Sequence, residues 1–297
     1  MDALFIGQTY IDVTFLTDHI PSGDDKTVAQ DYAVSFGGNA VTAAFCCAKL
    51  GVVPDLLTSL ADDWLGRMFL DMAAKYAIPV HGRKVKESSL SFVIPNNGKR
   101  AIIRCRDDDY LHPFPTLRLD GCRALHLDGH MGDAAIHYAK TCRDMGALVS
   151  LDGGGLRSNT HELLEHIDVA ICGERLAEQM NLDDKGLLEL LKAKGVKIGG
   201  VTRGERGMLW YDESGTVRVQ PPLLVPSSAI IDTNGAGDVF HGAYMYSYLA
   251  RPALPWEKHF EFARAASTHK IQKLGNENGL PSMNDITAVM QTFRPAA

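Results

Sequence analysis

Apolar and polar positions follow two patterns along the chain, and these patterns predict alternating strands and helices. Ala3–Gly7 is a short apolar run, typical of a buried strand. Asn39–Leu50 is apolar nearly all round and is followed by Gly51, so we expect a helix packed on both sides. Similar runs of strand or helix type continue at residues 53–59, 64–76, 124–127, 133–145, 148–151, 161–166, 169–172, 184–194 and 198–202. This order predicts an α/β fold, a mostly parallel sheet with helices on both faces.

Two stretches, residues 12–34 and 88–106, show strand-like alternation with no helix between their strands. The second contains a turn signal at Asn96-Asn97-Gly98. We expect a small antiparallel sheet that stands off the main sheet as a lid and excludes water from a site. No linker rich in Pro, Gly or Ser separates the lid from the rest, so we expect residues 1–297 to form one domain.

Composition narrows the class of protein. Apolar residues make up 45% of the chain and charged residues 22%, which is ordinary for a globular protein. The net charge of −6 argues against a nucleic-acid partner, which would require a basic surface. The six cysteines show neither zinc-site nor disulfide spacing. No apolar run has the length of a signal peptide or a membrane span, so we expect a cytoplasmic protein with no membrane partner.

Residues 232–243, DTNGAGDVFHGA, carry the main candidate for chemistry. If a helix begins near Ala236, the N–H groups of Gly235, Ala236 and Gly237 converge in front of it and favour an anion such as phosphate. Asp238 would repel an anion at that place, so a catalytic role as a base explains it better than anion binding. A glycine-rich helix start with a surface acid is the plainer alternative.

Further stretches match one family in order along the chain. Residues 232–240 follow the pattern D-T-x-G-A-G-D-x-F, and residues 37–43, GGNAVTA, correspond to a Gly-Gly-Asn element. Residues 201–207, VTRGERG, contain Thr-x-Gly-x-x-Gly after a strand. The first strand is followed by Asp12, and residues 60–66 also fit. From about residue 3 to about residue 282 the chain resembles the ribokinase-like carbohydrate kinases, the PfkB group.

The resemblance implies a three-layer α/β/α fold with a small β lid, and it assigns roles to the matched residues. Asp238 would activate a sugar hydroxyl, with the amides of Gly235, Ala236 and Gly237 as the anion hole. The implied sugar contacts are Asp12, Gly37, Gly38 and Asn39, and the implied nucleotide contacts are Thr202, Gly204, Gly207, Gly235 and Gly237. The plainer alternatives are a turn residue for Asp12, a helix N-cap for Asn39 and a tight turn for residues 202–207.

The chain departs from the family at two places that concern cations. Many relatives carry Asn-x-x-Glu after the strand at 169–172, where this chain has Gly173 and Leu176. Glu174 is then the remaining weak candidate for a water-mediated magnesium contact, and we expect ATP and water to hold Mg²⁺. Some relatives bind potassium between the loop at Asp232 and the loop that corresponds to 273–279. That second loop also departs from the family pattern, so the sequence leaves a monovalent cation open and does not favour potassium.

Charged residues of the lid bear on the substrate. Lys26, Arg104 and Arg106 would suit a sugar with a phosphate, sulfonate or carboxylate group. Lys26 and the departures near Gly173 are similar to the branch of ketohexokinases and 6-deoxy-6-sulfofructose kinases. His130 stands where the sulfofructose branch would carry an arginine, which speaks against sulfonate recognition. A solvated lid edge is the alternative for all these charges.

Three functions remain open from the sequence. The favoured one is an ATP-dependent sugar kinase, a phosphotransferase acting on a primary hydroxyl of a ketose, a pentose or an anionic derivative such as sulfofructose. A nucleoside kinase would need an aromatic clamp for the base, for which the candidates are Tyr10, Phe15, Tyr32 and Phe92. A non-catalytic sugar-binding protein would be expected to lack Asp238. The apolar lid residues would also permit a homodimer through the lid.

Overall fold

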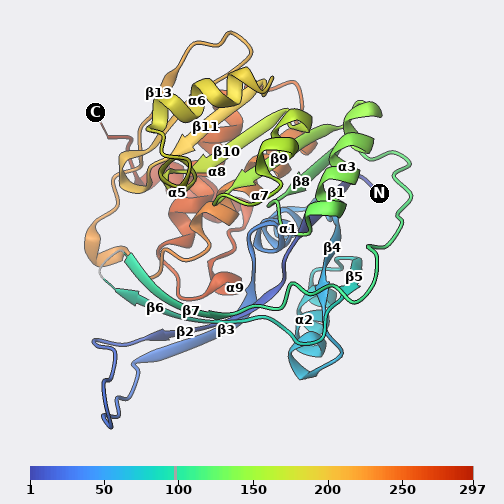
Figure 1. The fold of residues 1–297 in the computed structure, drawn as a ribbon. Helices are drawn as coiled ribbons and strands as arrows, with labels where there is room; N and C mark the ends of the chain where they lie inside the picture. Colours follow the sequence, from blue (N-terminus) through green and yellow to red (C-terminus); the bar gives the residue numbers. More distant parts are fainter. Residues whose placement is uncertain (97–98, 297) are drawn as a thin grey trace.

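A mostly parallel sheet forms the centre of the molecule (Figure 1). The computed structural model describes residues 1–96 and 99–296, and within them the sheet has nine strands in the order β13-β12-β11-β10-β9-β8-β1-β4-β5. The strands are β1 (Ala3–Gly7), β4 (Asp55–Leu60), β5 (Val80–Lys84), β8 (Ala124–Leu127), β9 (Leu148–Gly153), β10 (Val169–Gly173), β11 (Ile198–Thr202), β12 (Met208–Tyr211) and β13 (Arg218–Gln220). All pairs from β5 to β11 are parallel, and β12 and β13 add antiparallel pairs at one edge. The expected parallel sheet is therefore confirmed.

Helices cover both faces of this sheet because its central strands are apolar on both sides. In β1, Phe5 packs into one core with α1, α7 and α8, whereas Leu4 and Ile6 pack into a second core with α3 and α6. The two groups of helices lie on opposite faces of the sheet (Figure 1). The helices are α1 (Asn39–Leu50), α2 (Trp64–Lys75), α3 (Gly132–Asp144), α4 (Thr160–Leu163), α5 (Glu174–Gln179), α6 (Asp184–Ala193), α7 (Ala236–Ala250), α8 (Trp256–Lys270), α9 (Asn276–Gly279) and α10 (Met283–Thr292). None of the helices within the described residues has the length and hydrophobicity that a membrane span requires.

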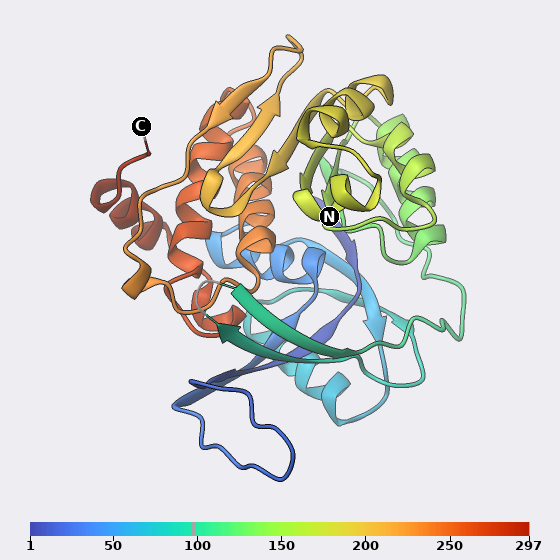
Figure 2. The same cartoon turned by 60° about the vertical axis from the view of Figure 1, so that its left-hand side comes forward.

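A second sheet forms the lid, in the order β3-β2-β6-β7. Its strands are β2 (Tyr10–Leu16), β3 (Asp31–Gly37), β6 (Leu90–Asn96) and β7 (Lys99–Cys105). β2 pairs antiparallel with β3 and β6 with β7, while β2 and β6 pair in parallel and join the two halves. The turn predicted at Asn96-Asn97-Gly98 includes residues 97–98, which lie outside the described residues. The lid lies beyond the carboxyl end of β1, which leads directly into β2 (Figures 1 and 2).

The register of the lid decides which of its residues face the same way. Asp12 of β2 pairs with Ser35 of β3 and Ser91 of β6, and Ser91 pairs with Arg104 of β7. Because paired residues in neighbouring strands share a face, these four lie on one side of the lid. Asp12 accepts hydrogen bonds from Asn234 and Asn276 of the main body, so this side of the lid faces the main body.

Candidate active site

The predicted anion hole lies at the start of α7. Gly235 is the N-cap, with a left-handed φ of 75°, and an added side chain there would collide with Asn276 Oδ1. Gly237, one position into the first turn, is exposed, and a Cβ built on it would have no neighbour within 4 Å. The Ala236 N–H makes one long contact, 3.4 Å from its nitrogen to Thr233 O. Among the described residues, the Gly235 and Gly237 N–H groups have no hydrogen-bond partner, so the first turn can offer amide donors to an anion.

Asp238 lies in this first turn, half-buried, and its carboxyl group has a strongly shifted pKa. Burial raises the pKa of Asp238 to about 7, and the Asp152 carboxylate contributes to the rise, while His241 and Arg100 oppose it. A carboxyl group with a pKa near the working pH can accept a proton from a hydroxyl and return it later. The predicted base is thus placed beside the anion hole in a state suited to proton transfer.

His241 and Asp152 form a buried pair behind Asp238. His241 Nδ1 lies 3.2 Å from Asp152 Oδ2 and 3.0 Å from Gly237 O, and its Nε2 lies 3.2 Å from Ile171 O. Both ring nitrogens face acceptors, so both carry protons and the ring is an imidazolium. Burial alone would lower the pKa of His241, but the Asp152 and Asp238 carboxylates raise it above its ordinary value. A positive charge therefore lies between two carboxylates at the base of the anion hole.

The Asn39 side chain binds to the His241–Asp152 pair and does not cap helix α1. Its Nδ2 donates to Asp152 Oδ2 at 3.0 Å. The N-cap of α1 is Gly38, with a φ of 103°, and an added side chain there would collide with Gln8 O. The N-cap alternative for Asn39 is therefore wrong, because the backbone enters the helix one residue earlier, in a conformation that suits glycine. The sugar contact of Asn39 stays a prediction.

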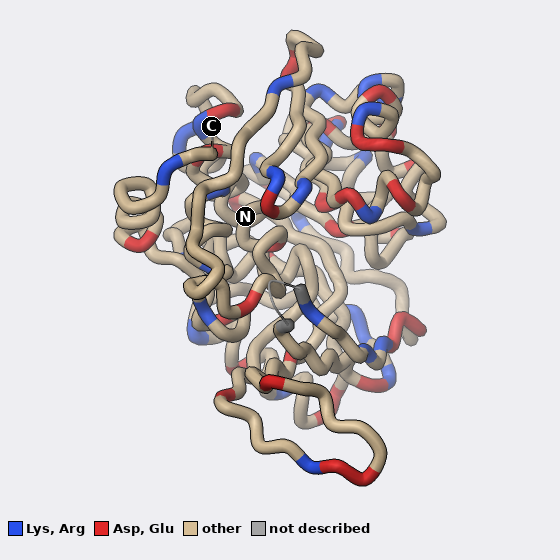
Figure 3. Tube along the Cα trace, turned by 90° about the vertical axis from the view of Figure 1, so that its left-hand side faces the viewer, with Lys and Arg blue, Asp and Glu red and all other residues tan. Residues whose placement is uncertain are grey.

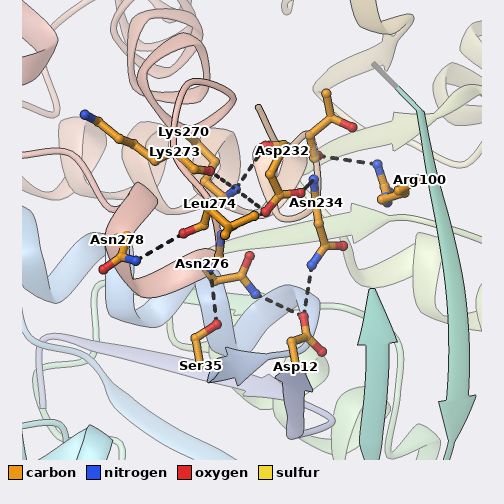
Figure 4. Close-up of polar contacts among 12 residues, drawn as sticks. Asp12, Ser35, Arg100, Asp232, Asn234, Lys270, Lys273, Leu274, Asn276 and Asn278 are labelled. Carbon is orange, nitrogen blue, oxygen red and sulfur yellow. Dashed lines mark hydrogen bonds and ion pairs between the residues drawn. The ribbon is translucent and has the colours of Figure 1, made fainter. Parts of the chain in front are cut away.

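Asp12 is held in place by two amide side chains (Figure 4). Asn234 Nδ2 and Asn276 Nδ2 donate to its Oδ2 at 3.0 and 3.1 Å. Within the described residues its buried Oδ1 has no hydrogen-bond partner, and burial raises the pKa of this carboxyl group. A buried acceptor without a donor is unusual in a folded protein and suits a ligand hydroxyl. Gly37 packs against the same carboxylate, since a side chain there would collide with it.

The predicted nucleotide segment is a tight turn at the end of β11. Thr202 Oγ1 donates to Cys172 O at 3.3 Å, and a 3₁₀ turn at Gly204–Arg206 leads into β12. Gly204 and Gly207 have φ values of 55° and 77°, and a side chain on Gly207 would collide with Gln220 O. The backbone of residues 202–207 is therefore a tight turn, which was the plainer of the two predictions for this segment. Nucleotide contacts of Thr202, Gly204 and Gly207 remain predictions.

Glu174, the weak metal candidate, is already paired. It begins α5, and its Oε1 accepts a hydrogen bond from Arg206 Nη2 in the turn after β11. In the part of the chain that the structure describes, no three His, Cys, Asp or Glu side chains come together in a way that could hold a metal ion. The residues present therefore fit a magnesium ion held by phosphate oxygens and water better than one held by a carboxylate set.

The lid brings one predicted substrate residue to the site and leaves another outside it. Arg104 shares the inner face with Asp12, donates to Ser91 Oγ at 3.2 Å and stacks 4.5 Å from the Tyr10 ring centroid. Lys26 is exposed in the long loop between β2 and β3. That loop extends away from the body of the molecule and carries charged positions near its far end (Figures 2 and 3). The structure therefore does not bring Lys26 together with Asp12 within one chain.

Several residues of the candidate site were not predicted from the sequence. Asp152 had a usable signal, since it lies one residue before the end of a parallel strand and precedes a run of glycines. His241 lies one helical turn after Gly237 and could have been placed by its spacing. Arg100 donates from the lid to Thr233 O at 3.4 Å, but its position in an alternating strand gave no hint of this contact. Asn276 and Lys270 gave no local signal, because their partners are far apart in the sequence.

Comparisons with known proteins show the family and the fold. The model of the pfkB family carbohydrate kinases matches residues 2–283 of this chain. The ribokinase of Lactococcus lactis is 21% identical over 96% of this chain and 96% of its own length. A provisionally assigned ribokinase structure from Agrobacterium tumefaciens superposes with a TM-score of 0.88 at 22% identity, covering 98% and 97% of the two chains. The structure of Arabidopsis thaliana ribokinase complexed with ribose and ATP superposes with a TM-score of 0.76 at 21% identity, covering 98% of each chain.

Fold and site together define an ATP-using phosphotransferase that acts on an alcohol group. The chain belongs to the pfkB family of carbohydrate kinases and has the ribokinase fold. Within that family it is a kinase of the sugar or nucleoside type.

Proposed function

We propose that this protein transfers the γ-phosphate of ATP to a primary hydroxyl of a small sugar, with Asp238 as the base. The observation that carries the proposal is the position of Asp238 in the first turn of α7, beside the N–H groups at the helix start, with a pKa of about 7. The hydroxyl gives its proton to the Asp238 carboxylate while its oxygen bonds to the γ-phosphorus. The bond from that phosphorus to the bridging oxygen breaks, and ADP leaves with the electron pair.

The sugar would lie under the lid, against the inner face that carries Asp12. Asp12 Oδ1, which has no partner among the described residues, would accept a hydrogen bond from a sugar hydroxyl. Asn39 and the Gly37–Gly38 backbone would complete the contacts on the side of α1. Arg104 is on the same face and would bind an anionic group at the far end of the substrate.

ATP would lie along residues 202–207 and 235–237. The amides at the start of α7 would hold the transferring phosphoryl group, and Arg100, which already contacts Thr233 O, would add positive charge from the lid. Magnesium, when bound with the nucleotide, would neutralise phosphate charge.

The positions of the lid aromatics favour a sugar over a nucleoside. Phe15 lies 6.4 Å from both Phe92 and Tyr32, measured between ring centroids. By the strand register these three lie on the outer face of the lid, opposite Asp12. Of the four aromatic residues considered for a nucleobase clamp, only Tyr10 shares the inner face, and its ring is already covered by Arg104.

The first test is the Asp238→Asn variant. We expect kcat to fall by ~100-fold or more with ATP affinity nearly unchanged, because the amide cannot accept the hydroxyl proton. Asp184→Asn is the matched control, since Asp184 is also an acid in the first turn of a helix, α6. Initial rates of ADP formation and ATP titration measure both quantities. Full turnover by Asp238→Asn would refute the assignment of the base.

A second test identifies the substrate class. ADP formation is measured against ketohexoses, pentoses, their phosphorylated or carboxylated derivatives, and nucleosides. If an anionic sugar is the substrate, Arg104→Ala should raise its KM by roughly 10-fold or more, because a charge-assisted hydrogen bond is lost. Lys26→Ala is the control with an exposed charge in the lid loop. Equal use of the neutral and the anionic form by the unmodified enzyme would remove the anion contact from the proposal.

A further inference from the structure

Lys270, the last residue of α8, is completely buried at 0% exposure. Its ammonium group donates to Asp232 Oδ2 and Asp232 O, both at 3.1 Å, and to Lys273 O at 3.3 Å (Figure 4). An ammonium group has three N–H donors, so these three oxygens use all of them. A buried positive charge is tolerated when it is paired and fully hydrogen-bonded, and both conditions are met here.

The surrounding loop is shaped around this side chain. A Cβ on Gly279 would collide with Cδ of Lys270, so the glycine leaves room for the lysine stem. Gly275, with a left-handed φ of 77°, directs its N–H to Asp232 Oδ2 at 3.0 Å. The carboxylate therefore receives donors from both the ammonium group and the 273–279 loop.

The ammonium joins two loops that both reach the candidate active site. Asp232 Oδ1 accepts from Asn234 N at 2.8 Å, immediately before the anion hole. Asn234, just before the anion hole, and Asn276, the first residue of α9, donate to the same oxygen of Asp12. One buried charge thus fixes the entry to the anion hole and the orientation of the sugar-side carboxylate.

We propose that Lys270 is a built-in monovalent cation, a positioning residue that makes the kinase independent of potassium. The resemblance to the carbohydrate kinases implies a place between these loops where a relative could hold potassium, and in this chain the ammonium lies there. The described residues therefore do not fit a potassium ion, because Lys270 occupies the oxygens that would bind it. The effect on catalysis rests on the proposed kinase function, whereas the effect on stability does not.

Two substitutions separate charge from space. Lys270→Met removes the charge and keeps most of the side-chain volume, whereas Lys270→Ala removes the charge and leaves room beside Asp232. We expect both to lower the Tm by roughly 5–10 °C in tetramethylammonium chloride, because Asp232 is left as a buried unpaired charge. Ammonium, methylammonium or potassium chloride should restore several degrees in Lys270→Ala but not in Lys270→Met. Lys273→Ala is the control, because only the carbonyl of Lys273 takes part.

The activity of the unmodified enzyme provides the second readout. Its rate should be the same, within about twofold, in tetramethylammonium and potassium chloride at equal ionic strength. Lys270→Ala should lose ~10-fold or more and recover with ammonium or potassium, in parallel with its Tm. Specific activation or stabilisation of the unmodified protein by potassium would overturn the proposal. A folded Lys270→Ala variant whose rate and Tm no cation restores would overturn it as well.

Failure of the kinase function and failure of this inference are distinguishable. If no sugar is phosphorylated, the Tm series of Lys270→Ala against Lys270→Met still decides whether a cation can replace the ammonium. If Lys270→Ala does not fold in any salt, the Tm of the unmodified protein tests the proposal. An equal Tm in all chlorides supports it, and a rise in Tm specific to potassium overturns it.

Discussion

Three causes set the pKa of Asp238 most strongly: burial, the Asp152 carboxylate and His241. The His241 imidazolium contacts Asp152 at 3.2 Å and lowers the pKa of Asp238, which burial and Asp152 raise. The two effects leave the Asp238 pKa at about 7. A base must be deprotonated to act, so kcat/KM should rise with pH and level off above about 7.

The His241→Asn substitution tests this arrangement. Removing the positive charge removes a cause that lowers the Asp238 pKa, so the acidic limb of kcat/KM should move to higher pH by roughly 0.5–1 unit. A full pH profile for both proteins measures the shift, and His161→Asn, on the exposed side of the short helix α4, is the control. An unchanged limb would show that His241 has only a structural role.

Helix α7 carries two glycines that serve different purposes. A Cβ on Gly242 would collide with the backbone oxygen of Ala43 in α1, so this glycine allows the two helices to approach closely. A Cβ on Gly237 would meet nothing within 4 Å, and the open space in front of it is where we expect the phosphate. The same Gly→Ala change should therefore affect stability at one position and activity at the other.

We predict that Gly242→Ala lowers the free energy of unfolding by about 1–3 kcal/mol, because a backbone atom cannot move aside as a flexible side chain can. Gly237→Ala should leave it unchanged or raise it by less than about 1 kcal/mol, since alanine favours the helix. Urea unfolding and kcat measured on both variants test the pair. We expect kcat to fall only in Gly237→Ala, and a fall in stability at Gly237 would contradict the assignment.

Elements with strong local patterns were predictable, and those without them were not. The strands at Ala3–Gly7, Ala124–Leu127 and Ile198–Thr202 have the predicted bounds because each is a buried apolar run. The edge strand Val80–Lys84 was missed, since its sequence VHGRK contains a single apolar residue.

Site residues divide in the same way. Asp238 and its glycines were predictable because they act within one turn of one helix. The contact of Asn39 with Asp152 spans 113 residues and that of Lys270 with Asp232 spans 38. Neither pairing leaves a periodic signal, because it is the fold that brings the partners together.

At the scale of the whole molecule, the part of the outer lid face that lies away from the core is apolar and exposed. Ile103 is 70% exposed, Tyr32 65% and Phe92 42%, all on the face opposite Asp12. Exposed apolar patches of this kind mark association surfaces. We propose that a second copy of the chain covers this face.

Tyr32→Glu combined with Ile103→Glu tests the association. Light scattering at micromolar concentration should give the mass of two chains for the unmodified protein and of one chain for the double variant, because two charges would be buried in the interface. Val219→Glu, at a 63% exposed position in β13, is the control and should not change the mass. A single-chain mass for the unmodified protein would exclude the proposed dimer.

The hydrogen bonds to Asp12 also determine how late in synthesis of the chain this carboxylate can be held in place. Its two amide partners follow it by 222 and 264 residues, so nearly the whole chain must leave the ribosome before this carboxylate is held. A chain ending before residue 276 would contain every residue assigned to the sugar and would still lack half of the support for Asp12. We therefore expect full affinity for the sugar only in chains whose synthesis has passed residue 276.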